Sequence, residues 1–199
     1  MFLRTRQSVR TFGAHLVADE TLERILTSAT AAPSAHNRQP WRFLVLTERA
    51  DKLLIADAMG ARLRKDRLAD GDPLEAVEAD VSRSKSRIAN APVVIFVFMT
   101  MEEMDTYRDS RRQAAERTMA IQGTAMAMQN LLLAAHAEGL GACLMCAPLF
   151  CPDVIAQTLE TPKEWEAQAI ITVGFAETVR EKKPRKTLAQ VMRKRPSSP

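Results

Sequence analysis

The sequence predicts one domain that mixes α-helices with β-strands around a buried central strand. Its 199 residues suit a single domain, which at this size buries roughly 70% of its unfolded surface. Residues 93–98 are β-branched or aromatic and apolar on both faces, the pattern of a central strand covered on both sides. Segments with apolar residues at helical spacing flank this run in the sequence, so the domain should combine helices with strands.

The other elements follow from local signals. Asp19 and Glu20 precede apolar residues at helical spacing, which predicts a helix capped by Asp19 that ends before Pro33. Further elements are expected as strand 42–47, helix 49–67, a helix with Asp72 as cap and Pro73 in its first turn that ends near Asn90, strand 142–146, helix 152–160 and strand 168–175.

The segment 111–138 is expected to be a long helix, because it contains no proline and ends at Gly139, a left-handed C-cap. Between Met119 and Ala137 it is apolar nearly all round, which is typical of a buried helix. In a domain this small a second copy buries such a helix most easily, so the pattern predicts a homodimer. We take residues 1–194 as one domain and expect residues 195–199 to be a disordered tail.

Composition excludes several classes of function. The net charge of +4 is scattered and interleaved with acidic residues, which argues against a nucleic-acid partner. The longest apolar run, near residues 91–101, is too short for a membrane span, so a soluble, cytoplasmic protein is expected. An odd count of three cysteines argues against a secreted disulfide framework.

Residues 33–43 carry the most informative signal, since a polar cluster lies between two prolines directly before a strand. Proline disfavours helix at the residue before it, so the loop should be largely ordered before any ligand binds. Ser34, His36 and Asn37 offer hydrogen-bonding groups suited to the edge of a flat heteroaromatic ring. Trp41 and Phe43 are interpreted as core anchors of the following strand.

Basic residues at both ends of the chain are candidates for phosphate binding. In an extended segment Arg6, Ser8 and Arg10 share one face, and two guanidiniums around a hydroxyl suit a phosphate. Lys183 and Arg185 repeat this alternation. An exposed basic N-terminus and a solvated basic tail are equally weighted interpretations.

No acid–base or metal constellation emerges. Cys143 and Cys146 form a CxxC, but residues three apart in a strand face opposite sides, so zinc or dithiol chemistry is disfavoured. His136 is expected in the core or an interface and His15 on the surface, and the Glu102-Glu103 pair is assigned no role. We therefore expect no catalytic side chain and no metal, as suits an enzyme whose cofactor carries the chemistry.

Taken together, these motifs resemble the FMN-dependent nitroreductase family. Residues 6–10 look like the family's opening RxSxR, and residues 33–43 look like its PSxxNxQPWxF loop. The resemblance implies an α+β sandwich, a mixed sheet flanked by helices in an intertwined homodimer, with two FMN sites between the subunits. It implies cofactor contacts by Arg6, Gln7, Ser8, Arg10, Lys183 and Arg185, by Pro33, Ser34, Ala35 and Asn37 of the other subunit, and by Met145, Cys146 and Ala147.

The same resemblance suggests the activity. It implies hydride transfer from NADH or NADPH to a small organic acceptor, such as a nitroaromatic or a quinone, by a ping-pong scheme. Common nitroreductases carry Glu-Gly where this chain has Cys146-Ala147, which leaves a backbone contact with the flavin rather than a side-chain one.

Two further stretches, 107–117 and 149–154, look like the reductase domain fused to the γ-glutamyl ligase of deazaflavin coenzyme biosynthesis. Reduction of a dehydro precursor of that coenzyme is therefore one alternative. A flavin-fragmenting enzyme, a dehalogenating enzyme and a flavin-binding protein without turnover are further ones. Anionic-substrate contacts would come from Tyr107, Arg108, Arg111 and Arg112, which could equally form a solvated first turn of the long helix.

Overall fold

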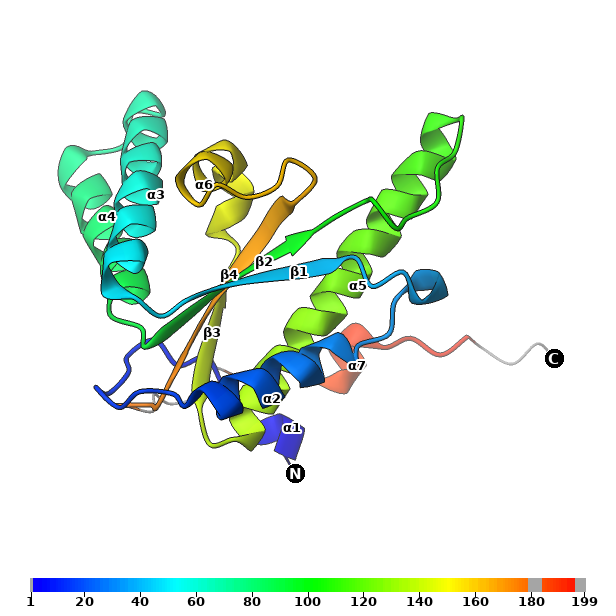
Figure 1. Cartoon of the computed structure of the whole chain (residues 1–199), viewed down its shortest axis with the longest axis horizontal. Coiled ribbons are helices and arrows are strands. Elements are labelled where there is room, and N and C mark those ends of the chain that lie inside the picture. The colour runs from blue at the N-terminus through cyan, green and yellow to red at the C-terminus, as the bar shows by residue number, and fades with distance from the viewer. Residues whose placement is uncertain (1, 179–183, 196–199) are drawn as a thin grey trace.

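The computed structural model describes residues 2–178 and 184–195, and its centre is a four-stranded sheet (Figure 1). The strands are β1 (Trp41–Leu46), β2 (Val93–Met99), β3 (Gly141–Met145) and β4 (Glu166–Gly174), in the order β1-β2-β4-β3. All three pairings are antiparallel. A parallel bridge between Ser8 and Ala142 continues the sheet beyond β3.

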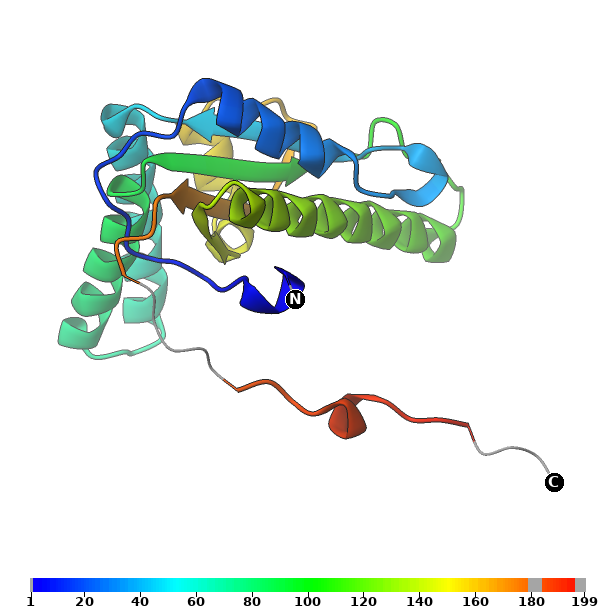
Figure 2. The ribbon, with the colours of Figure 1, turned by 90° about the horizontal axis from the view of Figure 1, so that it is seen from below.

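Helices cover both faces of the sheet, as the two views show (Figures 1 and 2). On one face lie α2 (Asp19–Thr30) and the 28-residue α5 (Ser110–Ala137). On the other lie the hairpin of α3 (Arg49–Ala69) and α4 (Leu74–Ala89) and the short α6 (Pro152–Thr158). The remaining elements are α1 (Phe2–Thr5), α7 (Leu188–Val191) and the 3-10 turns η1 (Ala35–Asn37) and η2 (Ala147–Phe150).

The strand β2 divides the core into two layers because its side chains alternate. Ile95 and Val97 pack with α2 and α5, whereas Phe96 and Phe98 pack with α3, α4 and α6. Every residue of β2 is buried, which confirms the predicted central strand covered on both sides. The observed arrangement is the expected α+β fold with helices on both faces of a sheet, but the four strands pair antiparallel rather than mixed, and the Ser8–Ala142 bridge supplies the parallel pairing.

Two predicted helix caps are wrong. The N-cap of α2 is Ala18 rather than Asp19, and Asp19 instead opens the helix, where its charge favours the helix dipole. Asp72 does not cap α4, because its carboxylate pairs with Arg67 of α3 while Pro73 takes the N-cap position. Gly139 has φ +75°, the left-handed conformation predicted for the end of α5.

The helix α5 is only half covered by its own chain. Gly123, Ala127 and Leu131 are buried, but Ile121 and Met126 on the other side remain 41% and 38% exposed. The predicted second copy that would cover them stays a prediction. No helix within residues 2–178 and 184–195 is both long and apolar enough to cross a bilayer. Residues 196–199 of the predicted tail lie outside the described residues.

Candidate functional site

The loop before β1 holds a strained conformation. His36, Asn37 and Gln39 have φ of 49°, 55° and 48°, the left-handed region that side chains disfavour. Gln39 therefore departs from the extended geometry expected before Pro40. The loop is closed by hydrogen bonds, because the Asn37 amide donates to the Ser34 carbonyl and the Gln39 amide donates to Ser34 Oγ, each at 3.0 Å. Such clustered strain marks candidate functional segments.

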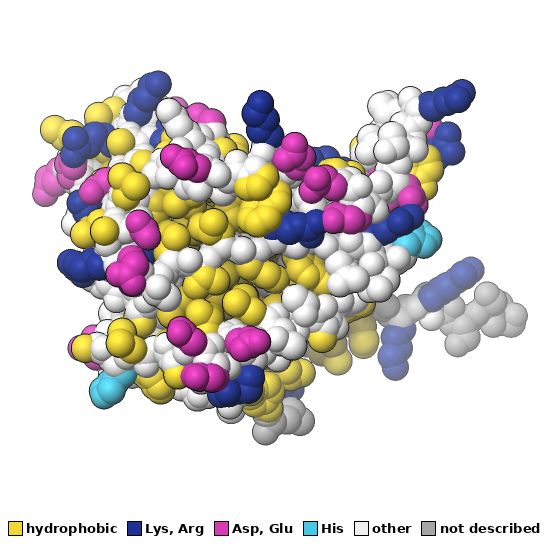
Figure 3. Space-filling model, viewed as in Figure 1, with side chains coloured by type: hydrophobic (Ala, Val, Ile, Leu, Met, Phe, Trp, Pro, Cys, Tyr) yellow, Lys and Arg dark blue, Asp and Glu magenta, His cyan; other side chains and the backbone are white. Residues whose placement is uncertain are grey.

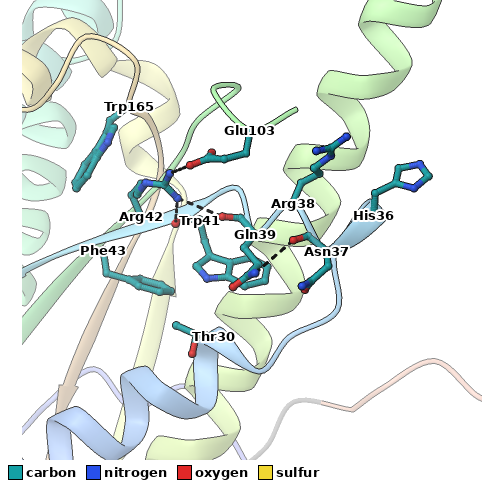
Figure 4. A pocket seen from close by; sticks show the side chains of 10 residues that line it. All are labelled: Thr30, His36, Asn37, Arg38, Gln39, Trp41, Arg42, Phe43, Glu103 and Trp165. Carbon is teal, nitrogen blue, oxygen red and sulfur yellow. Dashed lines mark hydrogen bonds and ion pairs between the residues drawn. The ribbon is translucent and has the colours of Figure 1, made fainter. Parts of the chain in front are cut away.

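This loop opens onto a cavity of about 660 Å³ (Figure 4). The volume lies in the range of small-molecule sites, which are mostly apolar with a few polar groups. Three aromatic rings and several amide or charged groups line it: Thr30, His36, Asn37, Arg38, Gln39, Trp41, Arg42, Phe43, Glu103 and Trp165. Trp41 is buried as predicted, whereas Phe43 is only partly buried and serves both core and cavity. In the surface view, hydrophobic side chains gather in the middle of this face (Figure 3).

Two ion pairs join the loop and β1 to residues 100–109. Arg38 pairs with Asp105, and Arg42 pairs with Glu103. Glu103, to which its local sequence assigned no role, thus forms part of the cavity wall through a partner 61 residues away in the chain. Each charge at the cavity from Arg38 and Arg42 is already balanced by a carboxylate.

Segment 100–109 is also fixed from beneath. The Thr100 amide donates to the Pro40 carbonyl at 2.8 Å. Oε1 of Glu116, a residue of α5 that is 1% exposed, accepts the Asp105 amide at 3.1 Å. The cavity wall therefore rests on α5 as well as on the loop.

The segment 6–10 lies against the edge of β3. The Val9 amide donates to the Ala142 carbonyl at 3.0 Å, and Val9 is buried while Ser8 and Arg10 are exposed. This is the predicted alternation for these residues, with Arg6 and Gln7 both half-buried. Within the described residues neither Arg6 nor Arg10 forms an ion pair, and the Arg10 guanidinium donates one hydrogen bond, of 3.4 Å, to the Ser8 carbonyl, so both positive charges remain without an acidic partner.

Met145, Cys146 and Ala147 follow at the end of β3, where the strand passes into η2. Cys146 is exposed beyond the strand and Cys143 is buried within it, and the cysteines of the chain are free thiols. Cys151 is buried, and burial raises the pKa of its thiol.

The candidate anion-binding residues lie around the start of α5: Tyr107 and Arg108 precede the helix, and Arg111 and Arg112 lie in its first turn. Arg112 lies over the Tyr107 ring, with its guanidinium carbon 5.0 Å from the ring centroid, and it also pairs with Asp109. Asp109 caps α5 by accepting the Arg112 amide, and this bond and the Arg112 guanidinium lower the pKa of the Asp109 carboxyl. Arg108 and Arg111 are exposed.

One chain does not bring the two candidate cofactor segments together. Ser34 packs against Gly123 of α5, whereas Thr5, next to Arg6, lies 2.7 Å from Nε2 of His136 on the same helix. These two positions of α5 are thirteen residues apart, which at 1.5 Å per residue is about 20 Å. His136, expected in the core or an interface, therefore contacts the N-terminal segment.

Of the two basic residues near the C-terminus that were candidates for phosphate binding, Arg185 is exposed, in the segment that leaves the body of the molecule (Figure 2). Lys183 lies outside the described residues. The geometry adds Glu103, Asp105, Gly123 and Gly141 to the residues around the site. No local signal identified them, because each acts through a distant contact.

Comparison with known proteins gives a consistent result. Residues 3–175 match the family model described as the nitroreductase family. A 5,6-dimethylbenzimidazole synthase of Rhodospirillum rubrum is 29% identical over 170 residues, covering 85% of this chain and 78% of that protein. A second 5,6-dimethylbenzimidazole synthase, from Rhodobacter capsulatus, is 29% identical over 182 residues, covering 88% of this chain and 82% of that protein.

Two solved structures are similar over almost the whole chain. A BluB-like flavoprotein from Clostridium difficile has a TM-score of 0.77 at 23% identity, with 96% of both chains covered. A protein of Desulfovibrio desulfuricans, described as a nitroreductase in complex with FMN, has a TM-score of 0.72 at 25% identity, with 99% of this chain and 96% of that chain covered.

Proposed function

This chain belongs to the nitroreductase family, and we propose that it is an FMN-dependent oxidoreductase that passes hydride from NADH or NADPH to a small organic acceptor. The observation that carries the proposal is the pair of guanidiniums around Ser8, neither of which has an acidic partner among the described residues. Arg6 and Arg10 stand on a segment anchored by buried Val9, so a phosphate would meet two positive charges and a hydroxyl.

The strained loop supplies the second half of the proposed site. The Ser34–Gln39 hydrogen bond holds the loop before a ligand arrives, which lowers the cost of ordering it. Pro33, Ser34, Ala35 and Asn37 are the proposed contacts with the flavin ring, and the amide of Cys146 or Ala147 would donate to it from the end of β3. FMN supplies hydride acceptance and donation, whereas the protein supplies binding and orientation.

A homodimer explains why these segments lie about 20 Å apart along α5 in one chain. From Thr118 to Ala137 the helix carries no Asp, Glu, Lys or Arg, and its exposed side chains include Ile121 and Met126. Antiparallel packing of two copies about residues 129–130 would place Gly123 of one copy opposite His136 of the other. The loop that contains Ser34 in one subunit and the segment that contains Arg6 in its partner would then form one cofactor site together.

A second candidate is formation of 5,6-dimethylbenzimidazole, the activity named for two relatives at 29% identity. The dimethylbenzene ring of that product matches the ring of a flavin, so this reaction would consume flavin rather than recycle it. Reduction of a deazaflavin precursor is a weaker candidate, because it rests on sequence resemblance alone. Flavin binding without turnover would use the same cofactor contacts, and the reduction test below separates it from the leading proposal. The ion pairs that balance Arg38 and Arg42 favour a neutral rather than an anionic molecule in the cavity.

The test is a visible spectrum of the purified protein with FMN, repeated anaerobically after NADH or NADPH. Bleaching of the bound flavin is the expected result, and readmission of air or a quinone should restore the colour over many cycles. Loss of flavin with 5,6-dimethylbenzimidazole detected by mass spectrometry would replace hydride recycling by the second candidate. Uptake of FMN with no reduction by either donor would contradict the proposed donor, and no uptake would contradict FMN dependence.

A further inference from the structure

Gly141 is the residue of β3 against which the Val9 side chain of the Arg6–Arg10 segment packs. A Cβ on Gly141 would lie 2.6 Å from Cβ of Val9 and within 2.8 Å of both its methyl carbons. Carbon atoms normally approach to about 3.5 to 4.0 Å, so no side chain fits without displacement of Val9. The backbone of Gly141 is not left-handed, so space alone excludes a side chain.

Gly123 likewise allows a close approach, here between α5 and the strained loop before β1. A Cβ there would lie 3.2 Å from Cβ of Ser34 and 3.4 Å from Cγ of Pro40. Glycine in a helix interior is unfavourable relative to alanine, and Gly123 stands in the middle of the 28-residue α5. Close approach of the strained loop accounts for its presence.

We propose that Gly141 and Gly123 are positioning residues that seat the two halves of the cofactor site, one glycine for each half. The proposal rests on the proposed FMN binding. A side chain at Gly141 lifts the phosphate-binding segment off β3, and one at Gly123 lifts the loop off α5. Neither glycine needs to touch the cofactor, because the segment it seats carries the contacts.

Helix α3 offers a matched control. Gly60 is also inside a helix, and its added Cβ would meet Cγ1 of Val81 at 3.2 Å, the same separation as at Gly123. This contact joins α3 to α4 and involves neither cofactor segment. Gly123→Ala and Gly60→Ala therefore add the same atom in the same secondary structure at the same nearest separation, and Gly123 differs in that its Cβ also meets Pro40 of the loop.

The test measures FMN affinity by fluorescence quenching, and thermal unfolding of the FMN-free protein in parallel. Gly123→Ala should leave the melting temperature unchanged or higher, as helix propensity predicts, while FMN affinity falls about tenfold. Gly60→Ala should leave FMN affinity at the wild-type value. A melting temperature that stays or rises while FMN affinity falls distinguishes a positioning role from a general folding defect, which would lower both.

Gly141→Ala should weaken FMN binding by about tenfold or more, because the added Cβ displaces Val9 and with it the Arg6–Arg10 segment. Wild-type protein that takes up no FMN would contradict the proposed function itself. Wild-type protein that binds FMN, with folded Gly123→Ala and Gly141→Ala variants of equal affinity, would overturn the positioning inference.

Discussion

The ammonium of Lys52 donates a 3.0 Å hydrogen bond to the carbonyl of Pro92 inside the seam between α3 and β2. It donates a second bond, of 2.9 Å, to the Ala91 carbonyl, and the residue is only 5% exposed. These carbonyls follow the end of α4, and proline cannot continue a helix, so they have lost the partners that a longer helix would give. A buried lysine thus supplies hydrogen-bond donors to the carbonyls of the turn that leads into the central strand.

Lys52→Met should lower the free energy of unfolding by about 2 kcal/mol, because two buried acceptors lose their donor. Lys65→Met, at an exposed position of the same helix, is the control and should change it little. Urea denaturation of both variants checks this. Equal midpoints for the two variants would show that the Lys52 bonds add nothing to stability.

The same lysine gives the protein a defined pH dependence. Burial lowers the pKa of Lys52 below its ordinary value of about 10.4. Between the two pKa values the unfolded state binds more protons, so this residue makes stability rise with pH as the pH approaches 10.4. Wild type should gain stability relative to Lys52→Met over that alkaline window. A difference that is constant with pH would contradict the lowered pKa.

Met126→Glu should convert the predicted dimer into monomers and abolish FMN binding. A carboxylate there would be buried without a partner if two α5 helices pack on this uncharged face. Leu54→Glu, which charges an exposed apolar position of α3, is the control. Sedimentation velocity at micromolar concentration is the measurement, and a wild-type monomer would refute the dimer.

Arg6→Ala together with Arg185→Ala should weaken FMN binding by about 3 to 6 kcal/mol if both guanidiniums bind phosphate. Riboflavin, which lacks the phosphate, should bind the variant and the wild type alike. Lys186→Ala removes a neighbouring exposed charge and serves as the control. Titration of both flavins decides the matter, since equal losses for FMN and riboflavin would indicate a role other than phosphate binding.

Glu103→Gln combined with Asp105→Asn should free segment 100–109 without unfolding the protein. Partly exposed ion pairs add little to global stability, so the melting temperature should change only slightly. Faster amide exchange confined to this segment is the expected result, followed by mass spectrometry. Unchanged exchange would mean that the Thr100 and Glu116 contacts hold the segment without the ion pairs.

Local sequence alone is enough to specify the covered central strand, the long helix with its glycine C-cap, and the family. In each case the structure depends on residues that are neighbours in the sequence. The signals are the apolar run 93–98, the stretch 118–137 without Asp, Glu, Lys or Arg, and the two motifs at residues 6–10 and 33–43. Alternation at Val9 is specified in the same way, because an extended segment on a surface has one buried face.

Contacts between residues far apart in the sequence depend instead on the tertiary structure. Glu103 gained a partner in Arg42, and Asp72 paired with Arg67 instead of capping α4. The close approaches at Gly123 and Gly141, and the left-handed backbone of Gln39, likewise depend on packing. Such contacts depend on residues that come together only when the chain folds. Their interaction energy is therefore not encoded in any local sequence pattern, and local sequence cannot predict them.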